Sequence, residues 1–119
     1  MFSFKKAERL SKKKLIQELF SKGSSFYLHP FKVIYLKSTN SELNQILISV
    51  PKSNFKRAAD RNAIKRRIRE GYRLNKTALT SDKNFLIAYI YSAKEILPSA
   101  VIHQKVISSL KKITEKNEG

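Results

Sequence analysis

The chain has 119 residues, with 25 Lys and Arg against nine Asp and Glu, so its formal net charge is +16. This length supports one hydrophobic core without disulfides, and a hydrophobic content of 41% argues against a disordered chain. Cysteine is absent, which excludes disulfides, thiolate nucleophiles and the common zinc sites. No apolar run predicts a membrane span or a signal segment, so we expect a cytoplasmic protein. The charge predicts a strongly anionic partner, with nucleic acid as the first candidate.

The first predicted helix covers residues 11–22. Ser11 is placed to cap its first turn, and Gly23 to end it in the left-handed conformation. Three consecutive lysines in the first turn, residues 12–14, oppose the helix dipole, a penalty that a nearby anion would remove. The apolar positions follow the spacing of an amphipathic helix, and they are Leu15, Ile16, Leu19 and Phe20.

Two strands are predicted next, over residues 31–36 and 45–50. A short polar segment connects them, which predicts that they pair with each other in antiparallel fashion. Residues 24–30 are a candidate short edge strand, although Pro30 limits how far its pairing can extend.

A long basic helix is predicted from about residue 55 or 57 to residue 75, with Asn54 as a plausible cap. A buried strand follows over residues 84–91, and a last helix begins after Pro98. The buried stripe of that last helix is predicted to consist of Ile102, Val106, Leu110 and Ile113.

The predicted fold class is α+β. We expect one domain over residues 1–119, with the element order α-β-β-α-β-α. Residues 1–8 and 115–119 are expected to be flexible, as chain ends usually are.

The basic helix carries the strongest functional signal, because five polar side chains fall within an arc of about 140° on it. These are Arg61, Asn62, Lys65, Arg66 and Arg69. Ile64, Ile68 and Tyr72 lie to the other side and can anchor the helix to a core. Arginine and lysine neutralise phosphates, and an asparagine can bond a backbone or base edge, so this face predicts nucleic-acid binding.

Two other interpretations of this face are open. It can be a solvated charged surface, but acidic residues that would pair with the cations at i, i+4 spacing are scarce. A membrane-surface helix is disfavoured, because the opposite side offers two isoleucines, Leu74 and one tyrosine, not a broad apolar wedge.

Aromatic side chains alternate along the strand at residues 31–36, with Phe31, Val33 and Tyr35 on one face. Most such stripes are core, and core is the better interpretation for Val33 and for Phe20 of the first helix. Tyr35 is ambiguous, because an aromatic ring at a sheet edge rimmed by lysines is what single-stranded RNA binding uses.

Catalytic arrangements are missing from the sequence. Neither His29 nor His103 has a metal-ligand spacing, and His103 is expected at the surface. No glycine-rich phosphate loop and no paired-carboxylate pattern is found. A self-contained protein active site is therefore not expected, nor is a protein-bound metal.

Residues 61–73, which read Arg-Asn-Ala-Ile-Lys-Arg-Arg-Ile-Arg-Glu-Gly-Tyr-Arg, resemble the RNR signature of the bacterial ribonuclease P protein family. Every fixed position of the pattern Arg-Asn-x-x-Lys-Arg-x-x-Arg-Glu, followed by an aromatic and Arg, is met. Arg9-Leu10 and Ser49-Val50 with Lys52 also resemble family segments. The resemblance covers nearly the whole chain, with its specificity concentrated in residues 61–73.

The resemblance implies a small α/β domain with about four strands and a left-handed β-α-β crossover, an exception to the common rule. It implies the protein subunit of ribonuclease P, an endoribonuclease that removes the 5′ leader of precursor tRNA. The chemistry is then expected on the catalytic RNA with bound Mg²⁺, and no obligate protein partner is expected.

The resemblance also implies two sets of site residues. The side chains expected to bind RNA are Lys52, Arg57, Arg61, Asn62, Lys65, Arg66, Arg69 and Arg73. The side chains expected in a cleft for the single-stranded leader, between the first helix and the sheet, are Ile16, Phe20, Phe31 and Tyr35. Between the strand and the basic helix this chain is one residue longer than the family pattern, over residues 52–57.

Two rival functions share the charge and the lack of catalytic groups. A structural protein that packs ribosomal RNA is the alternative, and only the signature argues against it. An architectural DNA-binding domain is the second rival, and it would bind duplex DNA in preference to single-stranded leader RNA.

Overall fold

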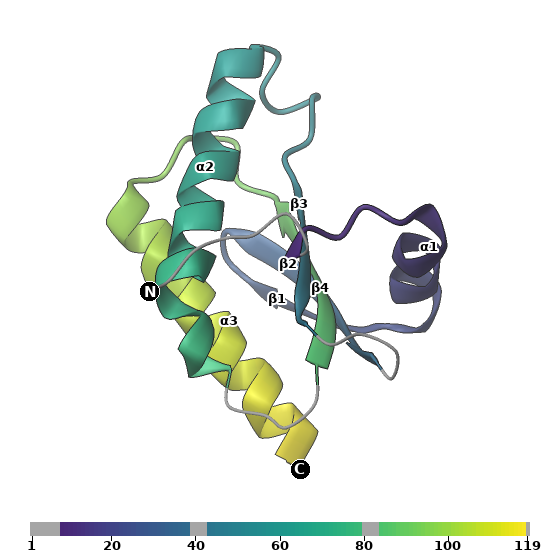
Figure 1. Cartoon of the computed structure of the whole chain (residues 1–119). Coiled ribbons are helices and arrows are strands. Elements are labelled where there is room, and N and C mark those ends of the chain that lie inside the picture. Colours follow the sequence, from purple (N-terminus) through teal and green to yellow (C-terminus); the bar gives the residue numbers. More distant parts are fainter. Residues whose placement is uncertain (1–7, 39–42, 80–83, 119) are drawn as a thin grey trace.

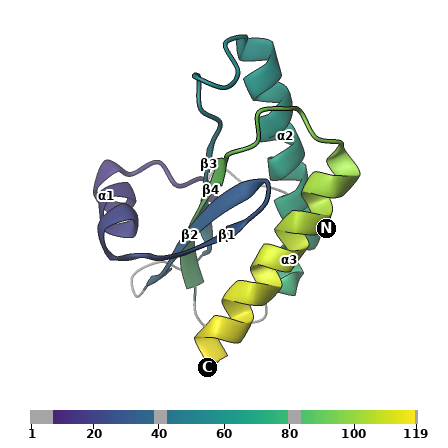
Figure 2. The same ribbon diagram turned by 180° about the vertical axis from the view of Figure 1, so that it is seen from behind.

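The computed structural model describes residues 8–38, 43–79 and 84–118 of the chain, with residues 117 and 118 described by their backbone alone. Its helices and strands are α1 (Lys13–Lys22), β1 (Ser24–Leu28), β2 (Phe31–Ser38), β3 (Gln45–Ser49), α2 (Ala58–Asn75), β4 (Asn84–Tyr91) and α3 (Ser99–Glu118), with a short 3-10 helix, η2 (Lys76–Ala78), after α2. The strands form one sheet with α1 on one face and α2 and α3 on the other (Figures 1 and 2). The predicted α+β class is confirmed, with β1 added to the predicted order.

The strand order across the sheet is β1-β2-β4-β3. β2 pairs in antiparallel fashion with both β1 and β4, and β3 pairs in parallel with β4. The predicted direct pairing of residues 31–36 with 45–50 is therefore wrong, because β4 lies between these two strands. The physical reason is burial: the nearly continuous apolar run of β4 has to be covered on both faces and on both edges.

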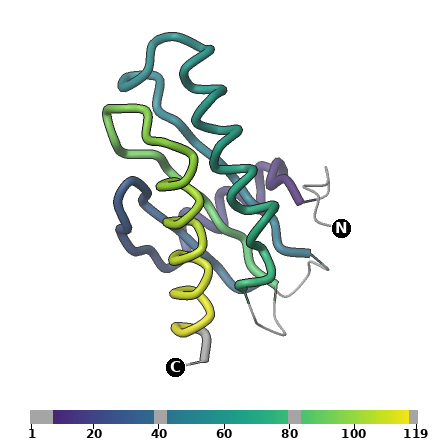
Figure 3. The backbone as a smooth tube through the Cα atoms, turned by 90° about the vertical axis from the view of Figure 1, so that its left-hand side faces the viewer, coloured from purple at the N-terminus to yellow at the C-terminus, as the bar shows by residue number. Residues whose placement is uncertain are grey.

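The crossover from β3 through α2 to β4 is left-handed. Viewed from the side of α2 and α3, both strands run upward, α2 lies in front of them, and β4 lies to the left of β3 (Figure 3). This arrangement agrees with the expectation from the family resemblance.

α1 differs from its prediction at both ends. It begins at Lys13, and its cap residue is Lys12, with no side-chain capping bond, so Ser11 is not the cap. Gly23 ends the helix with φ −69° and ψ 154°, an extended conformation and not the predicted left-handed one. Glycine is required here for space, since a Cβ atom at this position would lie 2.4 Å from the Leu19 carbonyl oxygen.

α2 begins at Ala58 with Arg57 as its cap residue, and no side chain makes a capping bond. Asn54 is not the cap: its backbone N–H donates to the Pro51 carbonyl in the preceding turn. The predicted anchoring side of the helix is confirmed, because its central apolar residues are all buried, namely Ile64, Ile68 and Tyr72.

Two apolar clusters lie on the two faces of the sheet. The larger one packs β2, β3 and β4 against α2 and α3, and it includes the predicted stripe of α3, with Ile102, Val106, Leu110 and Ile113 all fully buried. The smaller cluster lies under α1 and is centred on Leu19 and Ile34. α3 continues as helix to Glu118, so it includes residues that were expected to be flexible. His103 is half-buried, contrary to prediction, and it packs close to Gly71 of α2.

Candidate nucleic-acid interface

Four predicted side chains form an unpaired polar face on α2: Asn62, Lys65, Arg66 and Arg69. Asn62 and Arg66 are exposed, and Lys65 and Arg69 are half-buried. Within the described part of the chain, none of the four makes a side-chain hydrogen bond or an ion pair. A cationic surface whose hydrogen-bonding capacity is unused is suited to contact phosphates.

Other arginines of α2 are already engaged inside the protein. Nη1 of Arg61 donates to the carbonyls of Phe55 (2.7 Å) and Lys56 (3.0 Å), so this side chain shapes the turn before α2. Arg73 forms an ion pair with Glu70 at 2.7 Å. Because a guanidinium has five N–H donors, Arg61 retains donors for a further contact.

Two hollows border the unpaired face. One is lined by α2 alone, through Ala59, Asn62, Ala63, Arg66 and Arg69. The other lies between α2, β3 and the segment before α1, and it is lined by Arg9, Leu10, Ser11, Ile46, Leu47, Ile48, Lys65 and Arg69. Arg69 borders both hollows, so the cationic surface continues from the helix toward the edge of the sheet.

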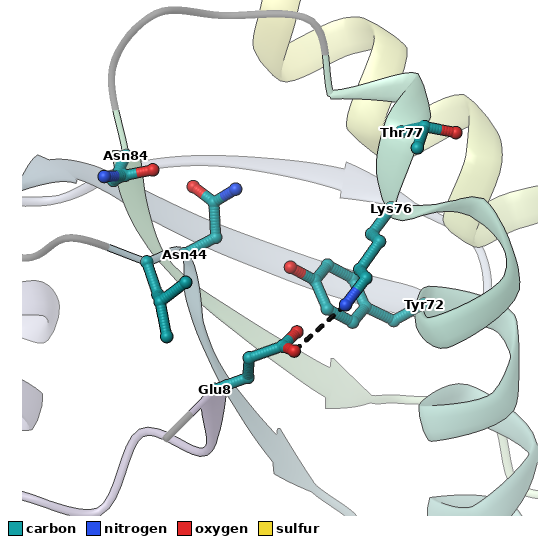
Figure 4. Close-up of a pocket in the computed structure, with 7 residues that line it drawn as sticks. Glu8, Asn44, Tyr72, Lys76, Thr77 and Asn84 are labelled. Carbon is teal, nitrogen blue, oxygen red and sulfur yellow. Dashed lines mark hydrogen bonds and ion pairs between the residues drawn. The ribbon is translucent and has the colours of Figure 1, made fainter. Parts of the chain in front are cut away.

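Arg9 is a candidate site residue that the predicted set did not contain. The segment around it is held on both sides: the Leu10 backbone N–H donates to the Ile46 carbonyl, and the Glu8 carboxylate pairs with the Lys76 ammonium at 3.0 Å (Figure 4). The Arg9-Leu10 pair resembles a family segment, but its place beside Lys65 depends on a contact between distant parts of the chain.

The carboxylate of Glu8 is buried, with 6% of its side chain exposed. Tyr72 lines the same pocket, and its ring lies beside the ion pair (Figure 4). Burial, and secondarily the negative charge of Glu8, raises the pKa of the Tyr72 hydroxyl well above its usual value. The Tyr72 hydroxyl therefore stays neutral. The Glu8–Lys76 ion pair links the segment that carries Arg9 to η2.

Lys52 and Arg57 lie before α2 and are both exposed. Neither lines the two hollows next to α2. Lys52 lies in the turn that follows Pro51, and Arg57 is the cap residue of α2. They extend the positive surface beyond the N-terminal end of the helix.

The side chains predicted to form the leader cleft do not all lie on the same face of the sheet. Phe31 is fully buried, with its ring centroid 5.2 Å from that of Tyr89 and 6.2 Å from that of Tyr91, on the side of α2 and α3. Ile16 packs on the opposite face, in the cluster under α1. The assignment of Phe31 to the cleft is therefore wrong, because alternation along β2 turns this ring into the main core.

Phe20 and Tyr35 lie near the same end of β1. Phe20 is 47% exposed, so its predicted core position is wrong, whereas Val33 is buried as predicted. Tyr35 pairs with Ser24, the first residue of β1, and lines a hollow with Lys37 and Lys116. The two rings come from opposite sides of the sheet, α1 for Phe20 and the α3 side for Tyr35.

Over residues 8–38, 43–79 and 84–116, whose side chains are described, no three His, Asp or Glu side chains gather where they could share one metal ion. No helix in the described ranges is long and apolar enough to cross a membrane.

A protein-family model described as Ribonuclease P matches residues 4–114. The chain is 39% identical over 80 residues to the ribonuclease P protein component of Porphyromonas gingivalis W83, an alignment that covers 66% of this chain and 58% of the relative. It is 37% identical over 116 residues to that of Dictyoglomus thermophilum, covering 98% and 92% of the two chains. The chain thus spans less than two thirds of the Porphyromonas relative.

Solved structures of the same class are similar in fold. The RNase P protein from Thermotoga maritima matches with a TM-score of 0.75 and 27% identity, over 88% of this chain and 96% of that one. The Staphylococcus aureus RNase P protein matches with a TM-score of 0.73 and 27% identity, over 92% and 97% of the two chains.

Proposed function

The chain belongs to the ribonuclease P protein family, and we propose that it is the protein subunit of cytoplasmic ribonuclease P. In this role it binds the catalytic RNA and the 5′ leader of precursor tRNA, and it assists the endonucleolytic removal of that leader. The observation that carries the proposal is the unpaired face of α2, formed by Asn62, Lys65, Arg66 and Arg69, which coincides with the family signature.

The unpaired face of α2 is proposed to dock on the RNA subunit. Its cations neutralise phosphates, and Asn62 donates and accepts hydrogen bonds at the RNA surface. Arg9 extends this contact toward β3, since it lines one hollow with Lys65 and Arg69. Lys52, Arg57, Arg61 and Arg73 add positive charge around the face, although Arg61 and Arg73 also hold intramolecular contacts.

Cleavage of the phosphodiester is proposed to take place on the RNA subunit, where bound Mg²⁺ supplies the chemistry. The part of this chain is to hold the two RNAs in register and to lower the repulsion between their phosphates. With a net charge of +16, the protein can reduce the concentration of Mg²⁺ that the assembled enzyme requires.

The leader is proposed to pass over the end of the sheet where α1 joins β1. On one side of this end, Phe20 offers an exposed ring for base stacking. Ile16 offers apolar contact on the side of α1 that faces the sheet. On the other side, Tyr35 lies in a hollow with Lys37 and Lys116, which supplies an aromatic wall and two cations. Stacking on these rings needs no particular base, as a variable leader requires.

The proposal is tested by reconstitution with a bacterial ribonuclease P RNA at low Mg²⁺. We expect the protein to raise the rate of precursor-tRNA cleavage over that of RNA alone, and to do so more for substrates with a leader than for those with a shortened one. Cleavage that is unchanged by the protein would contradict the proposal and favour the alternative that the chain packs ribosomal RNA.

A further inference from the structure

Residues 8–10, here called the edge segment, extend the sheet at the edge that β3 forms. β3 is the last strand of the sheet, and Arg9 makes a single parallel bridge with Ile46 of that strand. The Leu10 backbone N–H donates to the Ile46 carbonyl at 2.9 Å. One bridge is a weak attachment, because short pairings at the margin of a fold open most easily. The edge segment therefore depends on further contacts to keep its place.

Both neighbours of Arg9 in the chain are buried, toward opposite faces of the sheet. Leu10 is 3% exposed and belongs to the apolar cluster under α1. Glu8 is 5% exposed and lines a pocket with Tyr72, a residue of the cluster between the sheet, α2 and α3. Arg9 itself is exposed and lines the hollow between α2 and β3. Its backbone is thus held between two buried side chains, while its guanidinium lies at the cationic surface.

Glu8 places a negative charge close to this cationic surface. Among the acidic residues whose side chains the structure describes, Glu8 alone is buried. A buried carboxylate is costly unless a cation compensates it, and here the Lys76 ammonium lies 3.0 Å away, in η2 directly after α2 (Figure 4). The ion pair therefore joins the edge segment to the C-terminal end of the helix that carries the unpaired face.

We propose that Glu8 is a positioning residue for RNA binding. Its ion pair with Lys76 sets the edge segment so that Arg9 contacts the same stretch of RNA phosphates as Lys65 and Arg69. Glu8 does not touch the RNA, and it acts through Arg9. A guanidinium whose backbone is already in place loses less conformational entropy when it binds. The inference rests on the proposed function and deepens it, because it makes docking on the RNA subunit depend on an ion pair inside the protein.

Two simpler explanations predict other results for Glu8→Gln. If charge alone matters, this substitution should strengthen RNA binding, because it raises the formal net charge of +16 by one unit and releases the Lys76 ammonium from the carboxylate. If the ion pair serves stability alone, the melting temperature should fall and the RNA affinity of the folded protein should stay the same. A positioning role predicts weaker binding in spite of the added positive charge.

The first experiment measures the affinity of the full-length protein for a bacterial ribonuclease P RNA over a series of salt concentrations. We expect Glu8→Gln to weaken binding by about fivefold or more, as the loss of one charged hydrogen-bonded contact does. The slope of log affinity against log salt should become shallower by about one. Glu115→Gln is the matched control, because it removes the same charge from an exposed position of α3, and it should stay within about twofold of wild type.

A double-mutant cycle with Arg9→Ala tests whether Glu8 acts through Arg9. Arg9→Ala alone should lower the affinity and the slope as Glu8→Gln does. The double variant should bind within about twofold of the weaker single variant, because the second substitution then removes no further contact. Independent effects would multiply instead. Circular dichroism melting curves establish that each variant is folded at the temperature of the binding assay.

The proposal would be overturned if Glu8→Gln bound RNA as tightly as wild type or more tightly, or if the two losses multiplied in the double variant. Arg9→Ala tests it even if Glu8→Gln does not fold, since Arg9 is exposed and an unchanged affinity for this variant would also overturn it. Failure of the proposed function has a different signature, because the wild-type protein would then leave cleavage by the RNA subunit unchanged.

Discussion

Two neighbouring arginines of α2, Arg66 and Arg67, differ in exposure and in their contacts. Arg66 is exposed and borders the hollow next to Asn62, whereas Nη1 of Arg67 donates to the Leu97 carbonyl at 2.7 Å. Arg66 thus lies at the surface, whereas Arg67 links α2 to the segment before α3. A run of basic residues in the sequence therefore mixes exposed groups without an intramolecular contact with groups that hold the fold together, and only the contacts of each guanidinium separate them.

The matched variants Arg66→Ala and Arg67→Ala test this division. We expect Arg66→Ala to weaken binding to ribonuclease P RNA while the free energy of unfolding changes by no more than about 0.5 kcal/mol. Arg67→Ala should lower the free energy of unfolding by about 1–2 kcal/mol, because the Leu97 carbonyl loses a charged donor. Urea unfolding and RNA binding are measured on both proteins. If both variants lost the same RNA affinity at the same stability, the division would be wrong.

At the scale of elements, the junction of α1 and β1 depends on a close approach of two backbones. The Gly23 N–H donates to the Leu19 carbonyl at 2.8 Å, and a Cβ atom on Gly23 would lie 2.9 Å from Cγ2 of Ile34. No left-handed conformation is involved, so the need for glycine is one of space.

Gly23→Ala is therefore expected to lower the free energy of unfolding by about 1–3 kcal/mol, as overpacking of a filled site does. Chemical denaturation measures the loss. Gly71→Ala is a graded comparison, because its added Cβ would lie 3.0 Å from Cδ2 and 3.3 Å from Cα of His103, a looser approach than the 2.4 Å at Gly23. A Gly23→Ala protein as stable as wild type would show that the junction has room to relax.

Sequence periodicity predicted most elements, because each depends on residues within a few turns of one another. The apolar stripes of α2 and α3 and the strand β4 were predicted correctly. The pairing of the strands was not, since β4 follows α2 in the chain and yet lies between β2 and β3 in the sheet. Helix caps were also missed, because Ser11 and Asn54 had suitable side chains but lie outside the first turns.

The cationic face could be predicted from spacing alone, since the residues involved lie on one helix. The aromatic set could not, because the side of the sheet on which each ring lies depends on tertiary packing. Phe31 was placed in a cleft and is core, while Phe20 was expected in the core from its spacing and is exposed. Arg9 joins Lys65 only through a contact across the fold.

At the scale of the whole molecule, the core contains three tyrosines whose hydroxyl groups are removed from solvent to different degrees. Burial raises the pKa of Tyr72, Tyr89 and Tyr91 above the ordinary value of 10.0, and for Tyr89 the hydrogen bond to Ser109 opposes this effect. The folded state thus holds these protons more tightly than the unfolded state does. Their contribution to stability is fully present below about pH 10 and is lost as the pH rises above it.

Urea unfolding between pH 8 and pH 11 should accordingly show a stability that falls steeply above about pH 10. Tyr89→Phe removes one of the three hydroxyls, and it should make this fall shallower by up to about 1.4 kcal/mol per pH unit. An identical slope for the variant and the wild type would mean that Tyr89 ionises as easily in the folded state as in the unfolded one.

The molecule as a whole separates two kinds of surface. Cations gather on α2 and beside β3, and exposed aromatic rings lie at β1 and at the end of α1. The sheet and its two layers of helices hold these surfaces in a fixed relation (Figure 1). We infer that a folded RNA occupies the first surface and a single strand the second.

The central claim is that the cationic face of α2 binds the RNA subunit through its phosphates. It is tested most directly by measuring the affinity of the protein for ribonuclease P RNA over a series of salt concentrations. If about five phosphates are neutralised, the logarithm of the affinity should fall against the logarithm of the salt concentration with a slope of about −3.5 to −4.5. Arg66→Ala should make the slope shallower by about one. A slope near zero would contradict the account.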